Sequence, residues 1–350
     1  MTTQNAQATS ITLRKPDDFH IHFRDGQLLD LTVNHAAERF GRVGVMPNLI
    51  PPVITYAEGL EYRSRILNAL RDGNTLDPLM IMFLQKTTSV ECIKSAAQSP
   101  EFLGIKYYPS GVTTNSSSGV SNLKDVYTIL EAMEKNGLPL LIHGESPAKN
   151  VDVFDREARF LEDQIEPVLK DFPGLKVVME HISTSQAVDF VNAYEDRIGA
   201  TITAHHLMYN RNDMLGDGIK PHMYCKPILK RATHQDALRK AATSGKACFF
   251  LGTDSAPHGK GQKECSSGCA GCYTSHAAIE LYAEVFEQEN ALDKLEQFAS
   301  LNGAAFYGIK PNEETITLVK ESWTPEAQFT AGDVNIVPLR AGEEILWKIK

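Results

Sequence analysis

The chain has 350 residues, of which 42% are hydrophobic and 23% charged, a composition typical of a globular protein with a large core. Its formal net charge is -9 and it has no basic run to match a phosphate backbone, so we expect no nucleic-acid partner. No apolar stretch approaches the roughly 18 residues that span a bilayer, so we expect no membrane partner and a cytoplasmic location. The polar residues 1–10 are predicted to form a disordered tail.

Six cysteines without a secretory signal predict reduced thiols. Three of them, Cys265, Cys269 and Cys272, lie close together, and their CxxC pair could belong to a structural zinc site. A closed zinc site needs four ligands, however, and the chain has no second CxxC. We therefore expect thiols buried in a Gly-rich loop and keep zinc as the alternative.

Short apolar runs rich in β-branched residues recur along the chain and predict eight strands. Each run is bounded by turn residues or by a segment with helical periodicity. The predicted strands are Phe19–Phe23, Val43–Met46, Leu79–Leu84, Leu103–Tyr107, Leu138–His143, Lys176–Glu180, Ala200–Ala204 and Cys248–Gly252.

Helical periodicity fills the segments between these strands. In residues 121–137 apolar residues recur on one helix face, Ser121 is a suitable N-cap and Gly137 supplies a C-terminal stop. The same periodicity recurs in residues 155–170, 184–199 and 234–245. Alternating strands and helices imply a parallel sheet with helical crossovers.

Eight strand–helix repeats favour closure of this sheet into a barrel. The fold class predicted is therefore α/β, a (β/α)₈ TIM barrel of the metal-dependent hydrolase type, with residues 11–350 forming one catalytic domain and a C-terminal extension. The structural alternative is an open doubly wound sheet, but its GxGxxG motif after the first strand is missing. In a barrel, chemistry belongs at the C-terminal ends of the strands.

Polar side chains do end several of the predicted strands. His20 and His22 are two residues apart at the end of the first strand, so both imidazoles point to the same side. Alone, such a pair also fits two histidines with satisfied hydrogen bonds. His143, His181 and Asp254 end the fifth, sixth and eighth strands, however, and would meet them on one rim. Imidazole and carboxylate groups suit Zn²⁺.

Five such groups exceed the needs of one catalytic zinc, so a second metal becomes reasonable if a further group bridges the two. Lys106 lies near the end of the fourth strand. One interpretation is a lysine that extends its ammonium to solvent. The other is an uncharged amine that reacts with CO₂, because the resulting carbamate could hold two metals roughly 3.5 to 4 Å apart.

This arrangement resembles the amidohydrolase superfamily, and the local sequence is similar to that of the compact bacterial dihydroorotases. The motifs are PDDFHIHFRDG, VMPNLIPPV, KYYPSGVTTNSS, LIHGE, MEHIST, YCKPILKR and FLGTDSAPH, between about residues 16 and 275, with NGAAFYG beyond them. The resemblance implies a hydrolase acting on cyclic amides. Its reaction would be the reversible, zinc-dependent cyclisation of N-carbamoyl-L-aspartate to L-dihydroorotate in de novo pyrimidine (UMP) biosynthesis, and its assembly a homodimer.

The resemblance also assigns the metal ligands. It implies one zinc held by His20, His22 and Asp254, a second held by His143 and His181, and a bridge made by N6-carboxylated Lys106 and a hydroxide. Asp254 would also be catalytic, taking the hydroxide proton and delivering it to the leaving nitrogen.

Substrate contacts are likewise implied by the resemblance. Arg24, Asn48 and His258 would hold the substrate carboxylate, and the fork of an arginine suits that role because it can donate two parallel hydrogen bonds. Main-chain groups near Lys226 and Ala270 would make further contacts.

The segment 108–121 is long for a connection between a strand and a helix and is rich in Gly, Ser and Thr. The resemblance points to Thr113 and Thr114 as hydroxyls of a lid that reaches the bound substrate. The alternative is a solvated loop without contacts. His205 and His206 end the seventh predicted strand, but the family pattern asks for no ligand there, so we expect them to pack beside the ligands or in the core.

Two other functions remain to be separated from this one. A hydantoin or dihydropyrimidine hydrolase would share the metal centre, and only Arg24, Asn48 and His258 speak against it. A catalytically inactive relative acting as a binding module would lack some of the metal ligands, and here none is missing.

Overall fold

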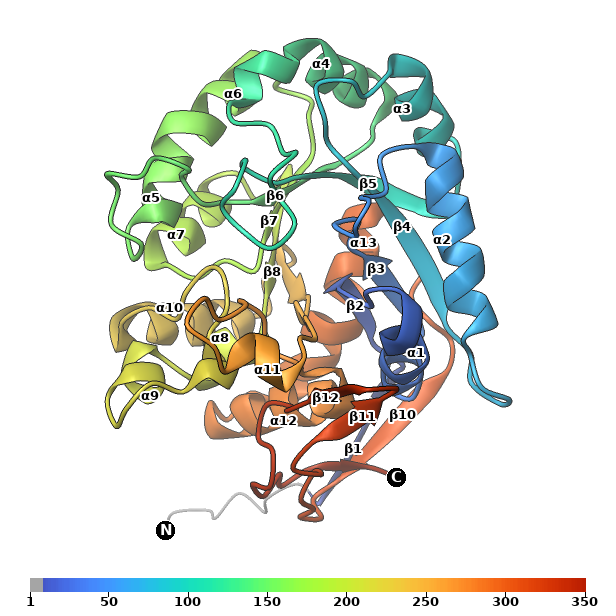
Figure 1. Ribbon diagram of the computed structural model, residues 1–350, viewed down its shortest axis with the longest axis vertical. Coiled ribbons are helices and arrows are strands. Elements are labelled where there is room, and N and C mark those ends of the chain that lie inside the picture. Colours follow the sequence, from blue (N-terminus) through green and yellow to red (C-terminus); the bar gives the residue numbers. More distant parts are fainter. Residues whose placement is uncertain (1–8) are drawn as a thin grey trace.

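The computed structural model describes residues 9–350, and its centre is an eight-stranded parallel sheet (Figure 1). Consecutive strands along the chain are neighbours in this sheet, as the sequence pattern predicts for a barrel. The strands are β2 (Asp17–Ile21), β3 (Arg42–Val45), β4 (Asp77–Phe83), β5 (Phe102–Tyr107), β6 (Leu140–His143), β7 (Val177–Glu180), β8 (Ile198–Ile202) and β9 (Phe249–Leu251).

The sheet closes where β9 meets β2. The Asp254 N–H donates to the His20 carbonyl at 2.8 Å, and the His22 N–H donates to the Ser255 carbonyl at 3.0 Å. These bonds join the C-terminal end of β2 to the residues that follow β9. Closure of the barrel therefore brings the first and last predicted metal ligands together, although they are more than two hundred residues apart.

Helices surround the sheet (Figure 1). Their bounds are α1 (Leu29–Ala37), α2 (Tyr56–Asn68), α3 (Val90–Ala97), α4 (Tyr127–Asn136), α5 (Arg156–Phe160), α6 (Glu166–Asp171), α7 (Ser185–Ala193), α8 (Ala204–Met208), α9 (Arg211–Leu215), α10 (Ala232–Ala242), α11 (Lys260–Lys263), α12 (Ala278–Gln288) and α13 (Asn302–Tyr307). The (β/α)₈ prediction is thus confirmed.

Two predicted helices differ in detail. The helix predicted over residues 121–137 ends at Gly137 as expected, where φ is +67°, a value that glycine adopts without a steric penalty. The predicted N-cap, Ser121, was wrong. The Asn122 side chain accepts the N–H of Lys124 instead and begins a 3₁₀ turn that leads into α4.

The helix predicted over residues 155–170 is interrupted between α5 and α6. A π-helical turn, Leu161–Ile165, lies there, and the Glu166 N–H reaches back five residues to the Leu161 carbonyl. Pro167 follows directly at the start of α6. Proline has no N–H to donate, so the regular hydrogen-bond ladder cannot continue through it.

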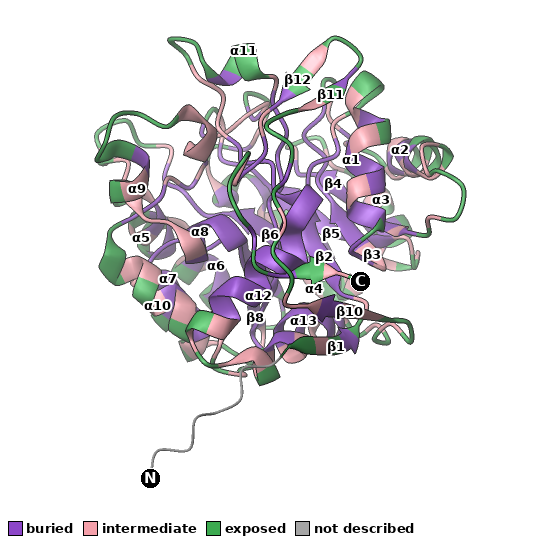
Figure 2. Cartoon of the chain, turned by 90° about the horizontal axis from the view of Figure 1, so that it is seen from below, coloured by how far each residue is buried: buried purple, intermediate pink, exposed green. Residues whose placement is uncertain are grey.

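Two buried layers hold the barrel together, and the strands form a buried centre inside more exposed helices (Figure 2). The larger apolar cluster lies between the sheet and the helices. The smaller cluster draws on strands around the whole barrel, and residues of α13 and the following loop pack against it. Its members are Phe19, Met46, Leu79, Ile81, Leu103, Leu141, Val178 and Phe250.

Additional strands come from the ends of the chain. β1 (Ser10–Arg14) pairs with β10 (Thr315–Val319), which pairs with β13 (Lys348–Ile349), while β11 (Phe329–Ala331) pairs with β12 (Val334–Ile336). Of the tail predicted over residues 1–10, residues 1–8 lie outside the described part and Ser10 begins β1. The domain limits stay a prediction. No helix within residues 9–350 is long and apolar enough to cross a membrane.

Candidate active site

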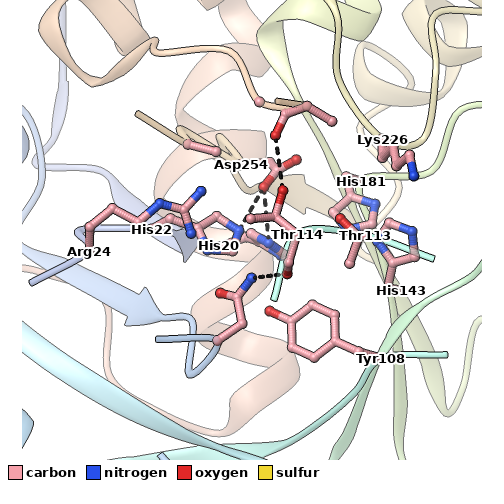
Figure 3. Close-up of a pocket in the computed structure, with 14 residues that line it drawn as sticks. His20, His22, Arg24, Tyr108, Thr113, Thr114, His143, His181, Lys226 and Asp254 are labelled. Carbon is pink, nitrogen blue, oxygen red and sulfur yellow. Dashed lines mark hydrogen bonds and ion pairs between the residues drawn. The ribbon is translucent and has the colours of Figure 1, made fainter. Parts of the chain in front are cut away.

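A cavity opens at the C-terminal ends of the barrel strands, where the labelled side chains converge (Figure 3). Most of the residues singled out in the sequence line it, and Lys106 and His258 lie outside its lining. The lining residues are His20, His22, Arg24, Asn48, Tyr108, Thr113, Thr114, His143, His181, Lys226, Asp254, Ala256, Ala270 and Gly271.

A first cluster, formed by His20, His22 and Asp254, brings its possible ligand atoms within 4.8 Å of one another. Asp254 Oδ1 lies 3.3 Å from His20 Nε2 and 3.0 Å from His22 Nε2. Burial raises the pKa of Asp254, but hydrogen bonds from both histidines outweigh it and hold this pKa well below its ordinary value. Burial also lowers the pKa of His22 to about 4, so a neutral imidazole faces an ionised carboxylate.

A second cluster consists of His143, the last residue of β6, and His181, which follows β7. His143 Nδ1 lies 3.3 Å from His181 Nε2. Burial lowers the pKa of both imidazoles, that of His181 well below its usual range. Two neutral rings that face each other through nitrogen atoms form a donor set suited to a metal ion.

Lys106 lies fully buried on β5, where its charge acts on histidines of both clusters. Its Nζ has no hydrogen-bond partner within residues 9–350. Burial lowers the pKa of Lys106 to about 8, against the opposing effect of the Glu180 and Asp254 charges. A buried ammonium without a partner is costly, so this position favours an uncharged amine or a derivative that a bound cation would neutralise.

Two carboxylates that the sequence reasoning missed support the histidines. Glu180 Oε2 lies 2.9 Å from His20 Nδ1 and accepts a hydrogen bond from the Thr201 hydroxyl. Glu145 Oε2 lies 2.7 Å from His143 Nε2. The available signal was their position in the chain, since Glu180 directly precedes one predicted ligand and Glu145 follows another by two residues.

Two of the three residues predicted to hold a carboxylate, Arg24 and His258, are in contact. Arg24 Nη2 is 3.1 Å from His258 Nε2, and Arg24 Nε donates to the Pro257 carbonyl at 3.3 Å. Arg24 Nη1 is buried without a hydrogen-bond partner in the described part of the chain. Burial lowers the pKa of His258 far below its ordinary value, and the positive charge of Arg24 lowers it further. His258 therefore supports Arg24 as a neutral ring, and Arg24 itself faces the cavity.

Segment 108–121 covers the cavity, and four hydrogen bonds anchor it. In one of them the Asn115 side-chain amide donates to the Asn48 carbonyl at 3.0 Å. Asn48 Nδ2 donates to the Thr114 carbonyl at 3.0 Å, and the Thr114 hydroxyl lies 3.4 Å from the Ala270 carbonyl. The Lys226 ammonium donates to the Val112 carbonyl. The prediction concerned only main-chain groups near Lys226, and the structure adds this contact of its side chain.

Three side chains of the site project from unusual backbone positions. The φ angles of Arg24, His181 and Asp254 are +64°, +42° and +45°. Residues with a Cβ pay a steric cost there, and such conformations concentrate at functional sites. This backbone turns the side chains toward the cavity as each strand ends.

A further group of possible ligands consists of His205, His206 and Cys225. His205 and His206 lie in α8 and not at the end of a strand, because β8 stops at Ile202. Both ring nitrogens of His206 are engaged, one at 2.8 Å by the Thr203 hydroxyl and the other at 2.9 Å by the Pro227 carbonyl. We therefore assign no metal to this group.

The cysteines of segment 265–272 are not gathered into one site. Cys265 is exposed, Cys269 is half-buried and Cys272 is buried, so the expectation of buried thiols was wrong for Cys265. Within residues 9–350, no group of three possible ligands includes any of the three.

Sequence comparisons agree along almost the whole chain. The amidohydrolase family model matches residues 18–320. The dihydroorotase of Shewanella baltica is 54% identical over 342 residues, covering 98% of this chain and 100% of the relative. The dihydroorotase of Shewanella oneidensis is 53% identical over 341 residues, covering 97% and 99%.

Solved structures of dihydroorotases are also similar to this chain. The dihydroorotase of Campylobacter jejuni has a TM-score of 0.91 at 37% identity, with 100% of both chains covered. That of Saccharomyces cerevisiae, in complex with 5-fluoroorotic acid, has a TM-score of 0.90 at 33% identity, covering 98% of this chain and 99% of the other. The L-hydantoinase (dihydropyrimidinase) of Arthrobacter aurescens has a TM-score of 0.80 at 14% identity, covering 99% and 86%, which shows a shared fold alone. This chain belongs to the amidohydrolase family and, within it, to the dihydroorotases.

Proposed function

We propose that this chain interconverts N-carbamoyl-L-aspartate and L-dihydroorotate at the cavity on the barrel rim. The observation that carries the proposal is the pairing of two histidine clusters with the half-buried Arg24 in one cavity. The clusters offer a site for metal-assisted hydrolysis of an amide, and Arg24 offers a partner for the carboxylate of an acidic substrate.

The proposed cofactor is a pair of zinc ions. His20, His22 and Asp254 would hold one ion, His143 and His181 the other, and carboxylated Lys106 would bridge them. The neutral rings of His22, His143 and His181 offer lone pairs to a cation. Lys106 Nζ is buried without a partner within residues 9–350, which supports a carbamate whose charge the bound cations would neutralise. Zinc bound here would polarise the ring carbonyl and lower the pKa of the attacking water.

Asp254 is proposed to move the proton. It lines the cavity as an ionised carboxylate, so in hydrolysis it can accept a proton from the attacking water and return it to the ring nitrogen as the C–N bond breaks. In synthesis the same carboxylate accepts the ureido N–H proton as that nitrogen attacks the side-chain carboxyl carbon, and it returns the proton to the carboxyl oxygen that leaves as water when the C–O bond breaks. Microscopic reversibility requires one residue for both directions.

The other residues bind substrate and exclude water. We propose that Arg24, supported by His258, holds the substrate carboxylate together with Asn48, which lines the same cavity. Thr113 and Thr114 line the cavity from the covering segment, so their hydroxyls are placed to reach a bound molecule. Main-chain groups near Lys226 and Ala270 complete the proposed contacts. A homodimer and a cytoplasmic location follow from family resemblance and remain part of the proposal.

Hydrolysis of dihydroorotate by the purified, zinc-loaded protein tests this function, followed through the loss of ultraviolet absorbance. Dihydrouracil and hydantoin serve as comparison substrates because they share the cyclic amide and lack the carboxylate. We expect dihydroorotate to be preferred strongly, and Arg24→Met to raise its KM while zinc content stays unchanged. Faster turnover of either uncharged ring would favour a dihydropyrimidine or hydantoin hydrolase instead.

A further inference from the structure

We propose that Glu145 is a positioning residue, whose carboxylate fixes the ring of His143 so that Nδ1 is the nitrogen presented to the second zinc ion. The inference deepens the proposed function and rests on its two-zinc centre. Glu145 contacts neither zinc nor substrate in this account and acts through His143.

The contact between the two side chains defines the protonation of the ring. Glu145 Oε2 lies 2.7 Å from His143 Nε2, and both side chains are buried. An ionised carboxylate only accepts hydrogen bonds, so Nε2 must carry the ring proton. A neutral imidazole has one such proton, which leaves a lone pair on Nδ1. Nδ1 is the atom that lies 3.3 Å from His181 Nε2 in the second cluster.

The position of Glu145 suits this role. Its N–H donates to the His143 carbonyl at 3.1 Å in the short turn after β6, so the carboxylate folds back onto the ring. The positive charges of Lys226 and Lys230 act on it from nearby, and Lys230 is buried. Burial removes much of the solvation free energy of a carboxylate, and nearby positive charges offset part of that loss.

The first cluster has the same arrangement with the ring nitrogens exchanged. Glu180 contacts His20 at Nδ1, which leaves His20 Nε2 facing Asp254. Each proposed zinc ion therefore has one histidine whose ring orientation and tautomer are set by a carboxylate. Carboxylates in this position raise the basicity of the ligand, and their loss commonly weakens metal binding by about 10- to 100-fold.

Competition with a chelator tests the proposal on the full zinc-loaded chain. Glu145→Ala should release one of its two zinc ions at a chelator concentration about 10- to 100-fold lower than the wild type requires. Glu145→Gln should need a chelator concentration between those of Glu145→Ala and the wild type, because its amide oxygen still accepts the His143 N–H but carries no charge. Glu280→Gln is the matched control: Glu280 is a buried carboxylate that binds Arg39 at 3.0 and 3.1 Å, far from any ligand in sequence.

We expect Glu280→Gln to keep both zinc ions at the wild-type chelator concentration even if it unfolds at a lower temperature. If Glu145→Ala keeps both ions as tightly as the wild type, the proposal is wrong.

The tautomer of His143 gives a readout that needs no variant of Glu145. In ¹⁵N-histidine-labelled wild type, with and without zinc, His143 Nε2 should carry the proton; His143→Asn identifies the signal by its loss. A proton on Nδ1 would overturn the proposal. If the wild type bound fewer than two zinc ions, the two-zinc centre would fail, and the tautomer would still decide the role of Glu145.

Discussion

At the scale of single residues, the sequence predicted Lys106 and the histidines around it as site residues but missed the side chains that contact them. The ligand candidates were predictable because a polar residue that ends a buried strand has few purposes other than chemistry. Glu145 and Glu180 were missed although each lies within two residues of a predicted ligand, because only the folded chain shows which side chain lies behind an imidazole. Tyr108 was missed for the same reason: its ring lies under the Lys106 ammonium, 5.4 Å away, and it lines the cavity.

Asp254→Asn tests the proton transfer. The substitution keeps the shape of the side chain and removes the proton acceptor, so we expect turnover of dihydroorotate to fall by about 10² or more. Zinc content measured on the same sample separates this effect from the loss of a ligand. Near-normal turnover at normal zinc content would assign the proton transfer to another group.

Glu157 predicts a pH dependence of stability. It is buried on α5, accepts the Ser183 N–H at 2.9 Å, and burial raises its pKa from 4.5 to about 7. Between about pH 4.5 and about pH 7, Glu157 holds its proton in the folded chain and loses it in the unfolded chain. This residue therefore makes the free energy of unfolding fall as pH rises. Glu157→Gln should remove the effect. The Tm of the variant relative to the wild type should therefore be higher at about pH 8 than at about pH 5, and an equal difference at both would contradict the assignment.

At the scale of elements, the eight strands were predicted to within about two residues because each is a short apolar run between turns. The helices were predicted less closely. Asn122 and Ser121 are both good N-caps, and only the course of the backbone decides between them. β1 and β10 escaped prediction, since their half-exposed residues become a sheet only by pairing across the length of the chain.

The covering segment 108–121 gives a prediction at this scale. Thr113→Val and Thr114→Val together remove two hydroxyls that line the cavity and leave the proposed zinc ligands untouched. We expect turnover to fall substantially, with zinc content and Tm nearly unchanged, because contacts from a lid are made best near the transition state. Steady-state kinetics within about twofold of wild type would show that these hydroxyls do not take part.

Lys226 allows the anchoring of the same segment to be tested separately. Lys226→Met keeps the main chain and an apolar stem but removes the donor to the Val112 carbonyl. A net hydrogen-bond contribution of about 1 kcal/mol corresponds to about a fivefold change in a binding constant. We therefore expect KM to rise by about that factor, with zinc content unchanged. Unchanged KM and turnover would mean that the segment stays in place without this contact.

At the scale of the whole molecule, barrel closure is what creates the site. His20 lies on the first barrel strand and Asp254 follows the last one, and the backbone hydrogen bond between them, 2.8 Å long, forms only when the sheet closes. The metal centre and the fold are therefore expected to depend on each other: bound zinc should stabilise the closed barrel, since a ligand that binds only the folded state shifts the unfolding equilibrium.

Elemental analysis of the purified, fully active chain tests the central claim most directly, because the ligand roles proposed for the rim histidines, Lys106 and Asp254 together require a two-zinc centre. The account predicts close to two zinc ions per chain, with activity lost in proportion as the second ion is removed. Full activity with a single zinc ion per chain would contradict it.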